Sequence, residues 1–544
     1  MTPRQSIGLT TTLLGCLLAM AARAERAPWD GVRADAIRGH VEFLASDLLE
    51  GRAAATRGYD IAAAYVAAQF RQAGLEPGGD EGDYLQNVPL LEATPVLPGS
   101  GVQLVREGEA YAFEYGTHYL PFADFTSASS TLTAPLVFVG FGVQAPELEY
   151  DDYAGVDAQG RIAVALSGAP EHFPAHQRAY HSWSHRKWSK LIEHGAVGLV
   201  MVDSLVDAQR VPWERKVAMS WTPQMRWLSE DNAPQNAYPE LKLRFLFNHE
   251  AAARLFAGAP LDLEQALANA QAGTAQGFEL PGMLTLTATT GLRRTQSANV
   301  LGLLPGADPQ LRDEYVVLTA HLDHLGRGAA VDGDTVYNGA HDNALGVGVL
   351  LETARALAGG PRPRRSILFA ALTAEEKGLL GSDYLAHRAQ QDGRRVAANV
   401  NVDMPLIFAP VRDFMALGAE HSSLGALARS ALSAEGYRMS RDPAPEEIAF
   451  IRSDQFSFVK RGAPAIALKS GLQSRNEAID IAELQRTYRR THYHQPSDDL
   501  SLPIDYPTAA DLARVAVRIT LQAANGPRPR WNRGDFFGER FSAN

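Results

Sequence analysis

The first part of the chain shows a helical repeat of apolar positions. Apolar side chains recur every three or four residues at Ile37, Val41, Leu44 and Leu48. A second run covers residues 59–72 and stops before Gly74. A period of 3.6 places such side chains on one face of a helix, and a glycine after the run is a common helix end. We therefore expect an N-terminal helical layer between residues 30 and 75.

Short β runs begin at about Thr131. They cover residues 134–140, 161–166 and 196–202, and Gly, Pro and Asp positions typical of turns separate them. A polar, Trp- and His-rich segment (172–190) and a helical stretch (248–270) complete the region. The change of pattern predicts an inserted, β-rich domain.

From Met283 onward, expected strands and helices alternate. Strands are expected at residues 315–320, 366–372 and 396–402, and helices at residues 345–358 and 378–388. Alternation with these lengths is typical of βαβ units, so we expect an α/β fold with a mostly parallel sheet flanked by helices. A chain of 544 residues also exceeds what one hydrophobic core usually organises, which favours two structural units.

The first 24 residues have the pattern of an export signal. Arg4 supplies a positive start, residues 7–22 an apolar run, and Ala24 ends an A-x-A cleavage site. The run is too short to span a membrane comfortably, so we expect cleavage and a periplasmic or secreted protein. Lipoprotein anchoring at Cys16 is the alternative. Because Cys16 is the only cysteine, the cleaved chain would hold any metal with histidine and carboxylate ligands.

The composition is that of a globular protein with an acidic balance. Apolar residues make up 46% and charged residues 21% of the chain, and the net charge is -11. An acidic chain is a poor partner for a polyanion, so we expect no nucleic-acid binding. No stable membrane insertion is expected either, and the oligomeric state stays open.

Histidine and carboxylate residues gather where the expected strands end. They are His321 and Asp323 after the first strand, Glu375 and Glu376 after the second, and Asp403 after the third. Asp342 directly precedes an expected helix, and His494 lies downstream in a turn-rich segment. Ligands of such sheets collect beyond the carboxyl ends of the strands. These residues are therefore candidates for one site.

Two histidines and three carboxylates suit a pair of zinc ions that share one bridging carboxylate. An extra carboxylate must remain free to move a proton, and the Glu375–Glu376 doublet can send one group to metal and the other to water. Asp323 can orient the imidazole of His321 through its other ring nitrogen.

The motifs AHLDH, GAHDNALG, TAEEKGLLGS, NVDM and YHQPSDD, between Tyr315 and Leu500, closely resemble the co-catalytic two-zinc aminopeptidases, which are relatives of glutamate carboxypeptidase. The segments VFVGFGV, GRIAVALSG and EHGAVGLVMVD resemble a protease-associated domain. The resemblance implies a zinc-exopeptidase-like fold with four parts. These are a signal peptide (1–24), an N-terminal part of the peptidase domain (25–130), a protease-associated insert (131–280) and a catalytic domain (281–544).

The same resemblance implies a role for each candidate residue. Asp342 would bridge two zinc ions, His321 and Asp403 would complete one site, and Glu376 and His494 the other. Glu375 would act as general base and proton shuttle, and Tyr493 would polarise the scissile carbonyl. Possible substrate contacts are Ser453, Asp454 and Phe456.

The expected activity is removal of N-terminal residues from peptides by metal-assisted hydrolysis. A metallo-carboxypeptidase or dipeptidase on the same scaffold is the main alternative, because Arg452, Lys460 and Arg461 could bind a substrate carboxylate. A one-zinc aminoacyl cyclase would not need a second metal site, and a catalytically silent receptor should lack a ligand or the base. Manganese or cobalt could replace zinc in the same ligand set.

Overall fold

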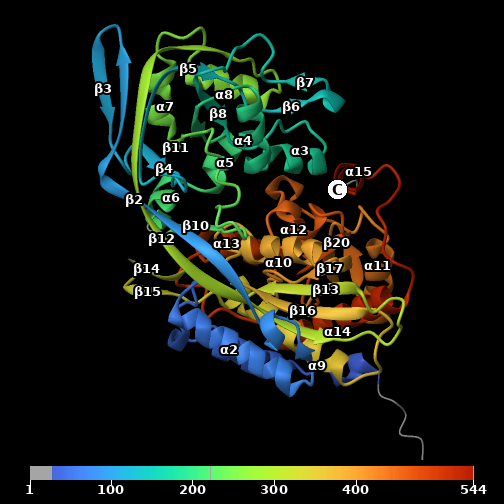
Figure 1. Ribbon diagram of the computed structural model, residues 1–544. Helices are drawn as coiled ribbons and strands as arrows, with labels where there is room; N and C mark the ends of the chain where they lie inside the picture. The colour runs from blue at the N-terminus through green and yellow to red at the C-terminus, as the bar shows by residue number, and fades with distance from the viewer. Residues whose placement is uncertain (1–26, 221, 543–544) are drawn as a thin grey trace, which may run out of the picture.

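The structure, a computed structural model, describes residues 27–220 and 222–542 (Figure 1). The expected export signal and Cys16 lie outside these residues. Within the described ranges, no helix combines the length and the apolar character that crossing a membrane requires.

Two N-terminal helices form the expected layer, α1 (Ala34–Leu44) and α2 (Arg57–Gln72). Ile37, Val41 and Leu44 are fully buried, as their spacing predicts. Leu48 is 78% exposed, so its predicted place on the buried helical face was wrong. The helix ends at Leu44, and a short 3-10 turn carries Leu48 away from the core.

The lower half of the molecule in Figure 1 is a sheet covered by helices on both faces. Its central strands run in the order β20 (Ala465–Ser470), β17 (Arg395–Asn401), β13 (Glu314–His321) and β16 (Ser366–Leu372), all parallel. Strands β18 (Asp413–Leu417) and β19 (Arg438–Ser440) extend one edge. The strands and helices expected from Met283 onward are therefore confirmed, within a few residues at their ends.

Side chains on successive positions of these strands enter different cores. Val316 and Leu318 of β13 pack with α1, α2, α9 (Leu345–Ala358) and α14 (Tyr506–Asn525). Val317, between them, packs on the opposite face with α10 (Leu380–Gln391) and α12 (Gln455–Val459). This two-sided burial fixes the register of each strand, and it holds the carboxyl ends of the strands rigidly at one edge.

A long antiparallel ribbon joins the two halves of the molecule (Figure 1). It consists of β2 (Leu85–Arg106) and β12 (Phe278–Leu304). One end of β12 pairs with β16 in the lower sheet, and the other end pairs with β5 (Ser129–Phe138) in the upper one. Leu284, Leu286 and Ala288 of β12 are buried and alternate with threonines, so the sequence does carry a strand pattern here, although no strand was predicted.

The upper half has its own parallel sheet and core. Its strands run in the order β5, β8 (Ile162–Leu166), β9 (Gly198–Val202) and β11 (Leu243–Phe247), with β4 (Tyr119–Pro121) antiparallel at the edge. Its helices are α3 (Ala175–Ser182), α4 (Ser184–Glu193), α5 (Leu205–Arg210), α6 (Trp213–Met219), α7 (His249–Phe256) and α8 (Leu263–Gln271). The core already includes Val102, Leu104 and Phe113, which precede Thr131 in the chain.

An aromatic cluster lies where α3 of the upper half meets α12 and α15 (Phe536–Phe541) of the lower half (Figure 1). Phe456 and Phe537 are at most 1% exposed and pack there with Tyr180. Trp183 contacts Phe456 edge to face, with ring centroids 5.2 Å apart. The upper half therefore packs against α12, the helix that follows Ser453 and Asp454.

Candidate metal centre

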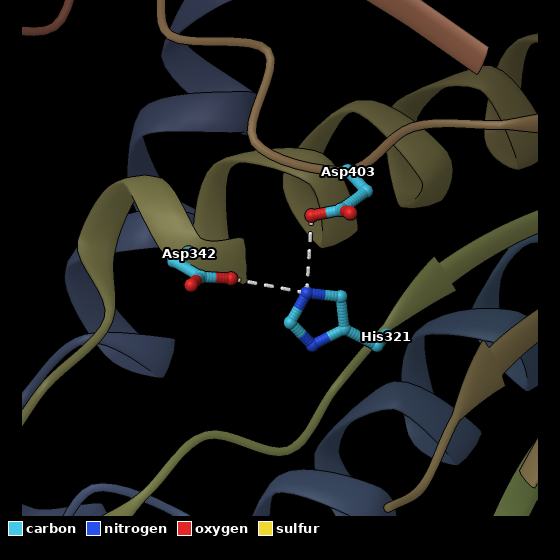
Figure 2. Close-up of side chains that lie close together, drawn as sticks. All are labelled: His321, Asp342 and Asp403. Atoms are coloured by element: carbon cyan, nitrogen blue, oxygen red, sulfur yellow. Dashed lines mark hydrogen bonds and ion pairs between the residues drawn. The ribbon is translucent and has the colours of Figure 1, made fainter. Parts of the chain in front are cut away.

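His321 lies at the carboxyl end of β13 and is 1% exposed. Its Nδ1 donates to the main-chain carbonyl of Asp323 at 3.1 Å, since a carbonyl can only accept. The other ring nitrogen, Nε2, faces Asp342 Oδ1 at 3.1 Å and Asp403 Oδ1 at 3.2 Å. Figure 2 shows both carboxylates converging on this nitrogen from different loops.

Asp342 stands between two histidines. Its Oδ1 faces His321, and its Oδ2 lies 3.4 Å from His494 Nε2. The side chain is almost fully buried in the loop before α9. One carboxylate thus presents each of its oxygens to a different imidazole.

A second group of ligand atoms forms on the Oδ2 side of Asp342. His494 Nε2 lies 3.1 Å from Glu376 Oε2. The other oxygen of Glu376 contacts His324 Nδ1 at 2.8 Å, and ligand atoms of His324, Asp342 and Glu376 lie within 4.8 Å of one another. His324 is not one of the five ligands that the sequence predicts, yet it shares this second group.

In both groups, nearby carboxylates raise the pKa of a histidine. Burial alone would lower the pKa of His321, but the carboxylates of Glu375, Asp342 and Asp403 outweigh it and hold that pKa well above its usual range. Burial would also lower the pKa of His494, but Glu376 and Asp342 outweigh burial and raise that pKa to about 9. Two buried imidazoles therefore hold protons at positions where a metal ion could replace them.

Glu375 and Glu376 follow β16, and their backbone is held by Asp323. The Asp323 carboxylate accepts the main-chain N–H of Glu375 at 3.0 Å and that of Glu376 at 3.3 Å. Its nearest carboxylate oxygen is 4.0 Å from His321 Nδ1. The expected orientation of the imidazole therefore comes from the carbonyl of Asp323, and its carboxylate positions the glutamate doublet instead.

Glu375 is partly exposed, and no hydrogen bond holds its carboxylate within the described residues. Burial by the surrounding protein and the nearby carboxylates of Asp403 and Glu376 raise its pKa well above the usual value, although His321 opposes them. A carboxylate with a raised pKa beside candidate ligands is suited to take up and release a proton.

Tyr493 precedes His494 and stacks on it, with ring centroids 3.8 Å apart. Its main-chain carbonyl accepts a hydrogen bond from Arg215 of α6 in the upper half. Arg215 also donates to the carbonyl of Arg489 at 3.3 Å. The upper half thus holds the loop that carries His494.

The three predicted substrate contacts lie in different environments. Phe456 is 1% exposed inside the aromatic cluster, and the Ser453 hydroxyl accepts from Asn401 at 2.7 Å. Neither side chain has a free surface for substrate, because tertiary packing uses both. Asp454 is also fully buried, but neither of its carboxylate oxygens accepts a hydrogen bond by distance and angle. Burial raises its pKa to about 7.

Two supporting residues were not found in the sequence. Asp498 is fully buried and accepts the main-chain N–H groups of His341 at 2.9 Å and Asp342 at 3.1 Å. Arg52, also fully buried, donates to the carbonyls of Leu322 at 2.8 Å and Gly339 at 2.7 Å. Both residues fix the loops that carry His321 and Asp342. Only the acidic pair in the motif PSDD could have pointed to Asp498.

Comparisons with known proteins agree with this placement of the site. Residues 299–520 match the model of peptidase family M28. The probable glutamate carboxypeptidase VP8 of Zea mays is 25% identical over 354 residues, which are 63% of this chain and 46% of that protein. Aminopeptidase YwaD of Bacillus subtilis (strain 168) is 36% identical over 109 residues, 20% of this chain and 22% of that protein. The chain therefore spans less than half the length of these curated relatives.

The structure is similar to that of the aminopeptidase from Aneurinibacillus sp. strain AM-1. The TM-score is 0.53 at 18% identity, and the similarity covers 92% of this chain and 96% of that one. This similarity shows a shared fold. All the candidate ligands lie within residues 299–520, the segment that matches the model of peptidase family M28.

Proposed function

We propose that this chain is a zinc-dependent aminopeptidase. The proposal rests on the two carboxylate oxygens of Asp342, one of which faces His321 and the other His494. A bridging carboxylate of this kind joins two metal ions into one catalytic centre. Support for zinc comes from related proteins described as probable zinc metalloproteases, one of which is 34% identical over 107 residues.

The residues present fit a pair of metal ions. Because His321 Nδ1 donates to a carbonyl, Nε2 is the ring nitrogen that could bind a metal, and it faces two carboxylate oxygens. The raised pKa of His321 places a proton on Nε2 among these oxygens, and a metal ion could replace that proton. In this proposal His321 and Asp403 would hold one ion, His494 and Glu376 would hold the other, and Asp342 would contribute to both sites.

The bound metal pair would lower the pKa of the attacking water and polarise the peptide carbonyl. Glu375 accepts the proton of that water, since its carboxylate stands beside the ligands and keeps some access to solvent. It then delivers the proton to the departing amine. Asp323 keeps Glu375 in place through the main-chain hydrogen bond, and Tyr493 packs against His494.

Two of the three cations that could bind a substrate carboxylate in a carboxypeptidase are already paired. Lys460 and Arg461 both contact the carboxylate of Asp383, at 2.9 and 2.8 Å. A cation already paired with a buried carboxylate is a poor ligand for a second one. Arg452 differs, because its ion pair with Glu447, at 3.7 Å, is partly exposed.

We also propose that residues 131–280 are a protease-associated insert and that the protein acts in the periplasm or outside the cell. The parallel sheet of the upper half and its separate core support the insert. The pattern of residues 1–24 supports export. Peptides are the proposed substrates.

The test is hydrolysis of leucine nitroanilide and of its N-acetylated form by the purified protein, with and without chelator and zinc. Release from the free but not the blocked substrate, lost with chelator and restored by zinc, is expected. Glu375→Gln should lower kcat by roughly 10²–10⁴-fold and still bind metal. Preferential hydrolysis of blocked peptides with a free carboxyl end would instead favour the carboxypeptidase, and activity that resists chelator would contradict a metal mechanism.

A further inference from the structure

A cavity of about 580 Å³ lies between the upper half and the segment before α12. Residues that follow β8, such as Ser167, and residues that follow β9, such as Asp203, line it. It therefore opens at the carboxyl ends of parallel strands, where α/β sheets bind their ligands. Its walls include none of the five proposed metal ligands.

The walls are largely apolar and aromatic. Phe141, Trp183, Trp188 and Ile451 all line the cavity. Trp183 is the same residue that packs on Phe456, so the cavity borders the aromatic cluster that joins the two halves. Such walls suit an apolar side chain of a peptide.

A buried ammonium group lies at this cavity. Lys187 lines it and is 2% exposed, and its Nζ donates to the carbonyl of Leu166 at 2.8 Å. Within the described ranges Lys187 makes no ion pair, and Asp152 and Asp207 act on it only from a distance. Nζ also lies 5.6 Å from the centroid of the Phe141 ring, and among the described residues it has no second hydrogen-bond acceptor. Burial lowers its pKa to about 7, as expected for a cation that lacks an anion.

A second buried donor belongs to the next residue. Trp188 is 6% exposed and lines the cavity, and its indole N–H has no hydrogen-bond partner. A buried donor without an acceptor costs free energy that a bound acceptor would recover. A cation and an N–H group beside apolar walls match a carboxylate attached to an apolar residue.

One short segment of the chain lies near both the cavity and the candidate metal centre. Arg452 lines the cavity, and Asp454, two residues later, acts electrostatically on His321 and Glu375. Arg452 itself acts on Tyr493, the neighbour of His494. Two residues span at most about 7 Å of chain, so this segment brings the cavity close to the metal centre.

From this arrangement, and resting on the proposed function, we propose that the cavity binds a carboxylate of the peptide substrate on the far side of the scissile bond, through Lys187 and Trp188. The enzyme would then prefer short peptides that end in an apolar residue with a free carboxyl group. An acidic side chain at the same place is the other source of the same chemistry.

Isothermal titration of Glu375→Gln protein with leucyl peptides of two to five residues ending in phenylalanine tests the proposal. Each peptide is compared as free acid and as amide, and amides ending in glutamate test the side-chain source. At one length or more, the free acid should bind about tenfold or more tightly than the amide. Lys187→Met should remove this preference, and Trp188→Phe, which keeps the ring, should reduce it.

Lys190→Met is the matched control, because Lys190 lies on the same helix and pairs with Glu193 outside the cavity. With Lys190→Met added, the Glu375→Gln protein should keep its preference for the free acid. Equal binding of acid and amide at every length, or a preference that survives Lys187→Met, would overturn the proposal. A preference only for the glutamate amides would assign the cavity to an acidic side chain and overturn the terminal-carboxylate form.

The acid-to-amide ratio is measured within one protein sample, so partial unfolding of a variant does not imitate the result. The outcome is also separate from the activity. Hydrolysis of leucine nitroanilide without any acid preference would leave the proposed function standing and remove the cavity proposal. A preference for the free acid in a protein that hydrolyses no peptide would leave the cavity proposal standing and remove the proposed function.

Discussion

Asp498 accepts the main-chain N–H of Asp342 at 3.1 Å, across 156 positions of the chain. The same oxygen also accepts from the hydroxyl of Tyr488 at 2.9 Å. The residue that would bridge two metal ions is thus aimed by a carboxylate that contacts neither imidazole.

Replacing Asp498 should therefore weaken metal binding without removing a ligand. We expect Asp498→Ala to lower zinc affinity by roughly 10–100-fold, the usual effect of removing a group that orients a ligand. Competition with a fluorescent zinc chelator measures this. Asp499→Ala, next to it on the surface, should bind zinc as the unsubstituted protein does, and equal affinity of both variants would contradict the role.

His494 and His324 both approach Glu376, and the account gives them different roles. His494 Nε2 faces Asp342 and Glu376 together, whereas His324 contacts Glu376 through Nδ1. His494→Gln should therefore lose one of two bound zinc ions, measured by mass spectrometry under native conditions. His324→Gln should retain both with an affinity lowered by about 10–100-fold. Loss of an ion in His324→Gln alone would exchange the two roles.

Arg215 links the upper half of the molecule to the loop of His494 through the carbonyls of Tyr493 and Arg489. Arg215→Ala should raise the mobility of that loop and lower zinc affinity and kcat by about tenfold, whereas Arg215→Lys, which keeps one donor, should lose less. Zinc affinity separates this role from a loss of substrate binding. A change confined to KM would show that Arg215 acts on the substrate and not on His494.

The sequence indicated that the candidate metal ligands lie close together, but it did not indicate their surroundings. The apolar runs of β13, β16 and β17 are typical of buried parallel strands. The sequence therefore predicted that the side chains at their ends lie at one edge of the sheet. By contrast, Arg52 and Asp498 are charged residues in polar segments, and only the tertiary fold buries them. Phe456 and Ser453 were predicted to contact substrate, but both side chains are buried by tertiary packing. In the long β2–β12 ribbon, apolar residues alternate with threonines only over residues 284–289, and residues 291–296 show no such alternation.

His181 should make the protein less stable in acid. It is 3% exposed, and burial lowers its pKa from 6.5 to about 4 although Glu147 opposes this. Between these two pKa values the unfolded chain binds a proton that the folded chain does not, so stability falls as pH falls through this window.

His181→Gln should remove this term, about 2 kcal/mol at pH 5. The midpoint of thermal unfolding should then drop less between pH 7.5 and pH 5 in His181→Gln than in the unsubstituted protein. His172→Gln, an exposed change in the same half, serves as control. Identical drops in all three proteins would contradict the buried neutral state of His181.

The most direct test of the central claim is a zinc titration of the metal-depleted protein, followed by hydrolysis of leucine nitroanilide. If Asp342 joins two ions into one catalytic centre, activity should rise until two equivalents of zinc are bound, and Asp342→Asn should stay inactive at every zinc concentration. Full activity at one equivalent, or substantial activity in Asp342→Asn, would contradict a centre bridged by Asp342.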